Sequence, residues 1–122
     1  MKDNPSPEEN YFKIIVALSR IIMPKMNIQI PPNLSPVSYQ TFLQTGINDW
    51  GGISPLTPDY VNPEFSWPSI KEVDENSANA GFELKARFPV YPEFISLVNP
   101  DLREKMETIN DGQGLVRADY WK

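Results

Sequence analysis

Residues 26–50, MNIQIPPNLSPVSYQTFLQTGINDW, contain the pattern that decides the fold. Apolar and polar residues alternate over 26–30, which is typical of a short strand, and the two prolines that follow end its hydrogen bonding. Ser35-Pro36 is typical of a helix start, and Gly46 of a helix that ends in a left-handed residue. Residues 47–49 then predict a second short strand. Strand, helix and strand with short connections are the pattern of a parallel α/β sheet.

A helix is predicted immediately before this stretch. Ser6, Pro7 and Glu9 form a capping box with a proline at the first helical position, and Pro24 ends the helix because the residue before proline avoids helical geometry. A stripe of apolar residues this wide predicts burial on more than one side of the helix. Its members are Tyr11, Phe12, Ile14, Ile15, Leu18, Ile21 and Ile22.

The pattern changes after Ser54. Four prolines between residues 55 and 68 predict an irregular, ordered loop, because proline interrupts both helices and sheets. The elements predicted beyond it are a helix from Trp67-Pro68 to Gly81, a strand-like stretch at 82–88, a short helical segment after Pro92 and a helix beginning at Asn99-Pro100.

Composition excludes several classes of protein. The 122 residues carry 11 basic and 16 acidic side chains, and the net charge of −5 argues against binding to nucleic acid or to an anionic membrane. The absence of cysteine and histidine excludes a structural zinc site, a disulfide framework and a Ser-His-Asp triad, and no metal ligands are predicted. The longest apolar run, 14–18, is far shorter than the roughly 20 residues of a membrane span, and no secretory signal is visible. We therefore expect a cytoplasmic protein.

Two parallel strands do not make a sheet of their own. Parallel sheets are covered on both faces and their strands are buried, which takes more elements than residues 6–54 provide. The chain therefore either oligomerises through its strand edges or forms part of a larger α/β fold. The second alternative is favoured.

Polar residues stand at the ends of both predicted strands. Asn48 and Asp49 end the second strand, directly before Trp50-Gly51-Gly52, and Gln29 and Asn33 stand at the end of the first. In α/β barrels the loops at this end of the strands bind ligands, and glycine lets the backbone approach them closely. The alternative for Asn48 and Asp49 is an ordinary turn, and the alternative for Gln29 is a strand residue that faces solvent.

Two segments resemble one family: IQIPPNL at 28–34 and GINDWGGISPLT at 46–57. They are similar to the C-terminal part of the radical S-adenosylmethionine synthases that form 7,8-didemethyl-8-hydroxy-5-deazariboflavin, the FO chromophore of deazaflavin coenzymes. The similarity continues through 61–64, 80–82 and 87–92, so it covers nearly the whole chain.

The resemblance implies a (β/α) barrel that houses a 4Fe–4S cluster and S-adenosylmethionine. It implies hydrogen abstraction by a 5′-deoxyadenosyl radical, then cyclisation of a tyrosine-derived adduct of a ribityl-aminouracil with loss of ammonia. Residues 1–54 would be the last βα units of the barrel, and 55–122 an irregular loop and a mostly helical C-terminal extension. The small-molecule substrate would be bound by Gln29, Asn33, Asn48 and Asp49.

The chain departs from the family in one respect. The family's cluster motif, CxxxCxxC, is absent and would lie upstream of Met1, in an N-terminal barrel half that acts as a partner. A further subunit or domain would form the tyrosine adduct. Because thiolates hold iron–sulfur clusters, these residues cannot generate the radical by themselves, and the chain alone should be inactive. The alternative function is a non-catalytic binding module that complements a separately encoded N-terminal half.

Overall fold

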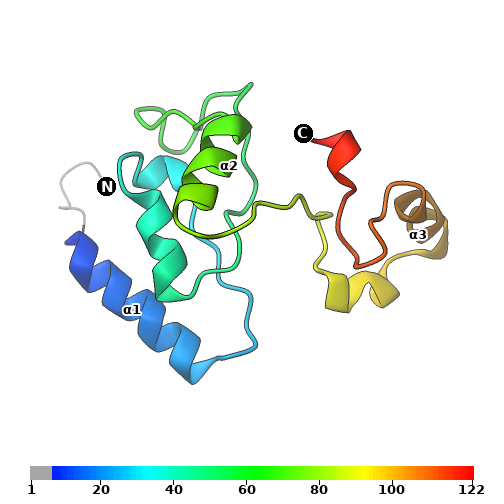
Figure 1. The fold of residues 1–122 in the computed structure, drawn as a ribbon, viewed down its shortest axis with the longest axis horizontal. Coiled ribbons are helices and arrows are strands. Elements are labelled where there is room, and N and C mark those ends of the chain that lie inside the picture. The colour runs from blue at the N-terminus through cyan, green and yellow to red at the C-terminus, as the bar shows by residue number, and fades with distance from the viewer. Residues whose placement is uncertain (1–6) are drawn as a thin grey trace. The chain divides into compact units, whose positions relative to one another are not determined.

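The computed structural model describes residues 7–122, which form two compact units that divide between Glu83 and Leu84 (Figure 1). The first unit comprises residues 7–83 and the second 84–122, and each is described by itself. The predicted cap residue Ser6 lies outside the described residues. The predicted division at residue 54 concerns the parts of a barrel and stays a prediction.

In the first unit, two α-helices and a short 3₁₀ segment pack against a central 3₁₀ segment, η2 (Figure 1). The two helices therefore share one buried neighbour. The elements in chain order are α1 (Glu9–Ile22), η1 (Pro32–Leu34), η2 (Tyr39–Thr45) and α2 (Ile70–Asn79).

The ends of α2 and η2 follow local sequence signals. At the start of α2, Ser69 and Glu72 form a capping box, and the helix begins at Ile70, two residues beyond the predicted Pro68. Gly81, with a φ of 88°, follows the helix as predicted. The helix predicted after Ser35-Pro36 is a 3₁₀ helix, and Gly46 ends it with a φ of 101°, as predicted.

The start of α1 differs from the prediction and its end agrees with it. The helix begins at Glu9 after an extended Glu8, so Pro7 is not the first helical residue. Glu8 is the N-cap residue, and its side chain makes no capping hydrogen bond. The helix ends at Ile22, two residues before Pro24, as the proline predicts.

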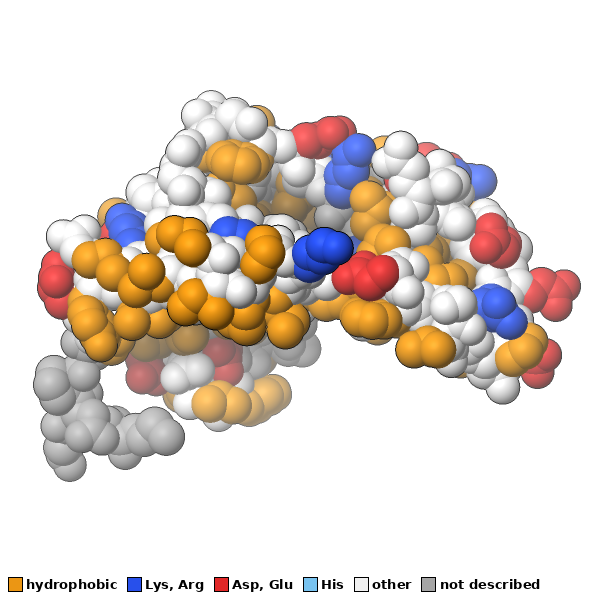
Figure 2. Space-filling view, turned by 90° about the horizontal axis from the view of Figure 1, so that it is seen from below, with side chains coloured by type: hydrophobic (Ala, Val, Ile, Leu, Met, Phe, Trp, Pro, Cys, Tyr) orange, Lys and Arg blue, Asp and Glu red, His pale blue; other side chains and the backbone are white. Residues whose placement is uncertain are grey.

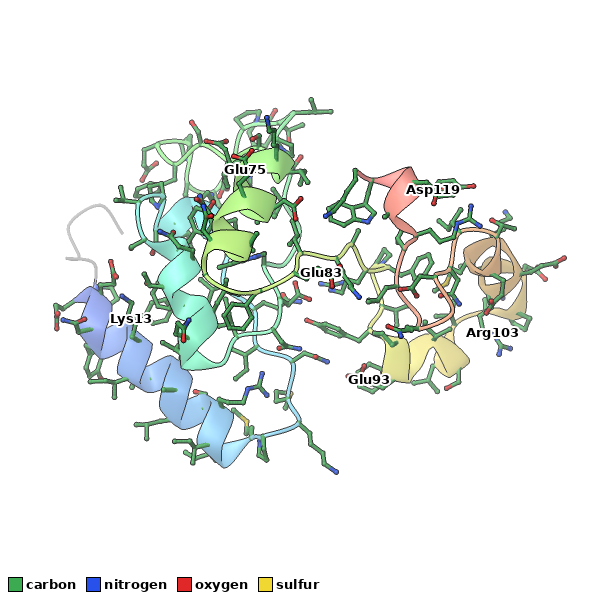
Figure 3. All side chains as sticks on the ribbon, viewed as in Figure 1. Lys13, Glu75, Glu83, Glu93, Arg103 and Asp119 are labelled. Carbon is green, nitrogen blue, oxygen red and sulfur yellow. The ribbon has the colours of Figure 1, made fainter. Side chains whose placement is uncertain are left out.

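Aromatic rings form the centre of the first unit. Phe42, which is fully buried, lies 5.3 Å from the Phe12 ring of α1, and Tyr39 meets Trp50 edge-on at the same centroid distance. Lys13 of α1, labelled in Figure 3, has its ammonium 5.6 Å from the centroid of the Phe42 ring. The other buried apolar side chains of this unit are Val16, Ile30, Ile47 and Val73.

The two predicted parallel strands are reduced to one isolated parallel bridge between Gln29 and Asp49. Its backbone bonds run from the amide of Asn48 to the carbonyl of Ile28, 3.2 Å, and from the amide of Ile30 to the carbonyl of Asp49, 3.2 Å. The parallel direction agrees with the prediction, but residues 7–122 contain no strand, so a barrel is not confirmed. The physical reason is that two short parallel segments have no neighbours on their outer edges to extend the ladder.

The strand-like stretch at 82–88 is also not a strand. Within it, Arg87 forms an isolated antiparallel bridge with Leu115, and Phe88 is buried in the second unit. The alternating apolar side chains are covered unevenly, since Phe88 is buried and Phe82 is exposed, and the segment lacks a partner long enough to form a ladder.

Most of the apolar stripe of α1 is exposed, contrary to the prediction of burial on more than one side. Val16 is the buried residue of this helix. Figure 2 shows hydrophobic side chains gathered over α1. We call the following residues the apolar face of α1: Tyr11, Ile14, Ile15, Leu18, Ile21 and Ile22, which are between 42% and 75% exposed.

The second unit contains one α-helix and two 3₁₀ helices: η3 (Pro92–Leu97), α3 (Pro100–Glu107) and η4 (Ala118–Tyr120). The side chain of Asn99 caps α3, as predicted, by accepting a hydrogen bond of 2.9 Å from the amide of Asp101. After the helix, an isolated antiparallel bridge between Asn110 and Val116 closes the turn at residues 110–116. No helix of the described residues is long and apolar enough to cross a membrane.

Candidate functional site

The parallel bridge brings three of the four predicted site residues together. Gln29 and Asp49 are the two bridge partners, and Asn48 precedes Asp49 on the same segment. Gln29 and Asn48 are exposed, and Asp49 is half-buried. Asn33 lies in η1 and has different partners, described below. The bridge therefore brings Gln29, Asn48 and Asp49 together as a polar cluster.

The side-chain amide of Asn48 joins the two bridged segments. Its Oδ1 accepts a hydrogen bond of 2.8 Å from the backbone amide of Ile28 and one of 3.1 Å from Nη2 of Arg20. Its Nδ2 donates to Oδ1 of Asn27 at 2.6 Å. Both ends of this side chain thus have partners within the chain, which gives Asn48 a structural role beside any contact with substrate.

Arg20 is the organising residue that sequence reasoning missed. From the last turn of α1, its Nε donates to the carbonyl of Gly46 at 2.7 Å, and its Nη1 to the carbonyls of Pro24 and Met26 at 3.0 and 2.7 Å. A basic residue in the last turn of a helix is a signal for bonds to nearby carbonyls, but it does not identify Gly46, 26 residues away.

Asp49 forms a tight turn into the glycines that follow. Its Oδ1 accepts a hydrogen bond from the amide of Gly51, which has a φ of 73°. Trp50 points into the core, where its Nε1 donates to Oγ of Ser77 at 3.4 Å. The turn considered as the alternative for this segment is therefore present, while substrate binding by Asn48 and Asp49 stays a prediction.

Asn33 anchors the proline-rich loop. This fully buried side chain donates from Nδ2 to Oδ2 of Asp59 at 2.8 Å and to the carbonyl of Phe65 at 3.4 Å. Its Oδ1 is buried without a hydrogen-bond partner. The amides of Asn62 and Val61 also donate to Asp59, and these bonds, that of Asn62 above all, lower the pKa of the Asp59 carboxyl.

The contact between Asp59 and Asn33 joins residues that are 26 positions apart in the sequence. The local signal for part of its role was available, because an aspartate whose side chain accepts from amides two and three residues ahead is a common turn former. No local pattern indicates that Asn33 is the partner of Asp59.

The side chains of this chain do not fit an iron–sulfur cluster. The sequence has no cysteine, and thiolates are the ligands that hold such clusters. Within residues 7–122, no three or more acidic side chains come together in a geometry that would hold a metal ion. The chemistry available at the bridge is hydrogen bonding by amides and carboxylates.

A shallow apolar hollow of about 390 Å³ follows the apolar face of α1. It is lined by Met23, Pro24, Lys25 and Met26, directly after the last residue of the helix. Three carbonyls of the same loop, those of Met23, Pro24 and Met26, accept hydrogen bonds from Arg20. The apolar face thus continues to the loop that Arg20 holds.

The chain is similar over most of its length to named synthases. It is 40% identical over 119 residues to the 7,8-didemethyl-8-hydroxy-5-deazariboflavin synthase of Methanopyrus kandleri, which covers 96% of this chain and 36% of that protein. It is 54% identical over 92 residues to the synthase of the same name from Methanococcus maripaludis strain C5, covering 75% and 26%. It is 43% identical over 125 aligned positions to the FO synthase of Streptomyces coelicolor, covering 98% and 14%.

The similarity lies in a C-terminal part of these relatives, as the resemblance predicted. The chain spans about a third or less of the length of the relatives it matches. No family model matches the chain, and no solved structure matches it.

Proposed function

Because the chain is homologous to a C-terminal part of 7,8-didemethyl-8-hydroxy-5-deazariboflavin synthases, we propose that it serves as that part of a synthase in FO biosynthesis. The observation that carries the proposal is identity of 40% over 96% of the chain with a relative of that name. The relatives are longer, so the remainder of the enzyme comes from residues outside this sequence.

In this proposal the radical step belongs to the N-terminal part. The resemblance implies a radical S-adenosylmethionine enzyme with a 4Fe–4S cluster, and this chain has no cysteine to hold one. The role of this chain is then to bind the substrate and to orient it beside the cofactor. The fold around it would be the end of a (β/α) barrel, in which the bridged segments 28–30 and 47–49 pair with further strands.

The proposed substrate contacts are the polar cluster and Asn33. A ribityl-aminouracil adduct carries hydroxyl, N–H and carbonyl groups, which amide and carboxylate side chains bind well. Gln29 and Asp49 are the strongest candidates, because the bridge holds them side by side and Gln29 is exposed. Asn48 and Asn33 would contribute to substrate binding in two ways. They would contact the substrate, and they would hold neighbouring segments in place through their bonds to Ile28 and Asp59.

The proposed partner is the N-terminal barrel half that carries the cluster. The apolar face of α1 supports this proposal, because a contiguous exposed apolar surface marks an interaction site in a folded protein. A separate subunit or domain would form the tyrosine adduct that the synthase cyclises.

The experiment substitutes Asp49 and Asn48 in a protein that joins this segment to its N-terminal part. Asp49→Asn keeps an oxygen for the amide of Gly51 but removes the charge, whereas Asp49→Ala removes both. If the carboxylate binds substrate, Asp49→Asn should lower product formation about tenfold or more at an unchanged melting temperature.

Asn48→Ala should lower both the melting temperature and product formation, because the side-chain amide bonds to Ile28 and Asn27 and so joins its own segment to the other. Full turnover per folded molecule in Asp49→Asn and in Gln29→Ala would contradict the site assignment. Loss of stability alone in Asp49→Ala would leave this residue as a turn former.

The second candidate function is a non-catalytic module that complements a separately encoded N-terminal half. The observation that favours it is the lack of cysteine in a chain that nevertheless forms its own core. Anaerobic reconstitution separates the two functions: the chain alone should retain no iron, and the assembled pair should retain a cluster. A pair that holds the cluster and substrate but makes no product would favour the non-catalytic module.

A further inference from the structure

We propose that Arg20 is a positioning residue that fixes the register of the two bridged segments and thereby places Gln29 and Asp49. The proposal rests on the proposed function, because it takes these two side chains as substrate contacts. Arg20 itself lies at the C-terminal end of α1 and acts through Asn48.

Arg20 connects three parts of the first unit. Its Nε and Nη2 reach the turn after η2, at the carbonyl of Gly46 and Oδ1 of Asn48, 2.7 and 3.1 Å away. Its Nη1 reaches the loop after α1, at the carbonyls of Pro24 and Met26. The guanidinium holds these donors in one rigid plane, so the position of one acceptor determines that of the others.

Arg20 and Asn48 also fix the position of the first bridged segment. Oδ1 of Asn48 accepts from Arg20 and also from the amide of Ile28, the residue before Gln29. The carbonyl of Met26, which begins that segment, accepts from Arg20 at 2.7 Å. Arg20 therefore bonds to Gly46 and Asn48 around the second segment and to Met26 before the first, and Asn48 links the two segments through Ile28.

This connection matters because the bridge itself is short. Two backbone hydrogen bonds join the segments, both of 3.2 Å, and residues 7–122 contain no ladder that would add more. A slip of one residue would turn every side chain of the slipped segment to the opposite face and move Gln29 away from Asp49. The side-chain bonds of Arg20 and Asn48 select the observed register.

Lysine cannot replace this arginine. An ammonium has its donors at one point on a flexible stem, so it cannot reach Gly46, Met26 and Asn48 together. Arg20→Lys therefore keeps the charge and the helix but loses the connection. This makes it the informative variant.

The first test is amide hydrogen exchange on the 122-residue chain. In Arg20→Lys, the amides of Ile28 and Asn48 should exchange about tenfold faster or more relative to the amide of Val73 in α2, whose bond to Ser69 is remote from Arg20. Val16→Ala is the matched control, since it removes buried volume from the same helix and should speed these amides and Val73 alike.

A second pair of variants protects the test against simple unfolding. Asn48→Asp keeps an oxygen for Arg20 and for Ile28 and should retain the protection, whereas Asn48→Leu should lose it as Arg20→Lys does. Protection of Ile28 within about twofold of the unaltered chain in Arg20→Lys would overturn the proposal.

The second test measures kinetics in the assembled enzyme. Arg20→Lys should raise KM for the adduct about tenfold while kcat per folded molecule changes less, because the contacts move but the reacting groups remain. An unchanged KM together with faster exchange would overturn the positioning role. Absence of product with the unaltered chain would instead refute the proposed function, and the exchange result would still decide whether Arg20 sets the register.

Discussion

The helices α1 and α2 both pack against η2, but the chain covers them to very different extents. The mostly polar α2 buries its two inward residues, Val73 and Ser77, almost completely. The more apolar α1 buries Val16 and leaves its apolar face exposed. The inward side chains of α2 are therefore fully buried by this chain, whereas the neighbours of α1 in the described residues leave most of its apolar surface exposed.

The difference separates two uses of apolar residues. In α2 they stabilise the unit that contains them, because burial removes their surface from water. The residues of the apolar face of α1 contribute little to the stability of the unit while they are exposed. A large exposed apolar patch also favours aggregation of a free monomer. Their stabilising effect depends on a partner, which we propose to be the N-terminal part of the synthase.

Phe42→Ala should weaken the packing of both helices against η2, and we expect it to have the largest effect on the free energy of unfolding. Phe42 is fully buried on η2 and meets Phe12 of α1, so the substitution leaves a cavity at the centre of the first unit. We expect a loss of about 3–5 kcal/mol in the free energy of unfolding, measured by chemical denaturation. Leu56→Ala, at a side chain 96% exposed, is the control and should change it by less than about 0.5 kcal/mol. Equal effects would contradict the described core.

The apolar face of α1 should control association more than stability. Ile14→Glu combined with Ile21→Glu should weaken binding to the N-terminal part about a hundredfold, because it places two charges in an apolar contact. Sedimentation or calorimetry measures the affinity. The melting temperature of the chain alone should stay nearly constant, since both side chains are more than half exposed. Unchanged affinity would remove the main support for a partner at this face.

A pair of single truncations sharpens the comparison of the helices. Val73→Ala in α2 should cost about 1–3 kcal/mol in the chain alone, since Val73 is fully buried. Ile21→Ala in α1 should cost less than about 0.5 kcal/mol, although it removes more carbon, because Ile21 is 73% exposed. Denaturant titration of both variants checks the order. The reverse order would mean that α1 is covered in solution, for example by self-association.

The capping box gives α2 a stability that α1 lacks at its start. Oγ of Ser69 accepts a hydrogen bond from the amide of Glu72, whereas the side chain of Glu8, the N-cap residue of α1, makes no capping bond. Ser69→Ala should therefore lower the free energy of unfolding by about 1 kcal/mol. Glu8→Ala should have no comparable cost. The helix signal in circular dichroism, followed through thermal unfolding, compares the two variants.

The smallest expected effect is on pH dependence. Hydrogen bonds from the amide of Ser69, and then from its hydroxyl, lower the pKa of Glu72 in the folded state. The ionised form is thus favoured by folding, so its contribution is present above the usual pKa of about 4.3 and is lost as the pH falls through the lowered value. Glu72→Gln should flatten this part of the stability curve. An unaltered slope below about pH 4 in this variant would contradict that role.

Sequence patterns predicted the elements with local causes. Gly46 and Gly81 end helical segments, Asn99 caps α3, and Pro24 follows the end of α1. Each of these features depends on a few adjacent residues, which the sequence displays directly. The direction of the bridge between 28–30 and 47–49 was also predictable, because a helical connection between two segments favours parallel pairing.

The failures have non-local causes. Alternation predicted strands, but a ladder needs neighbours that the described residues do not contain. The width of the apolar stripe on α1 indicated burial, but the described residues leave most of that stripe exposed. At the candidate site, the roles of Asn48 and Asn33 depend on Arg20 and Asp59, residues 28 and 26 positions away.

The turn at Gly46 has a consequence for how this segment can vary among related sequences. A Cβ at this position would lie 2.7 Å from Cγ and 2.9 Å from Cβ of Arg20, and the φ of 101° disfavours other residues as well. Any larger residue at 46 must therefore displace the arginine stem, so positions 20 and 46 are expected to be epistatic. In a library that randomises both positions, glycine should be retained at 46 wherever arginine is retained at 20. Alanine should be accepted there only in combination with a smaller residue at 20.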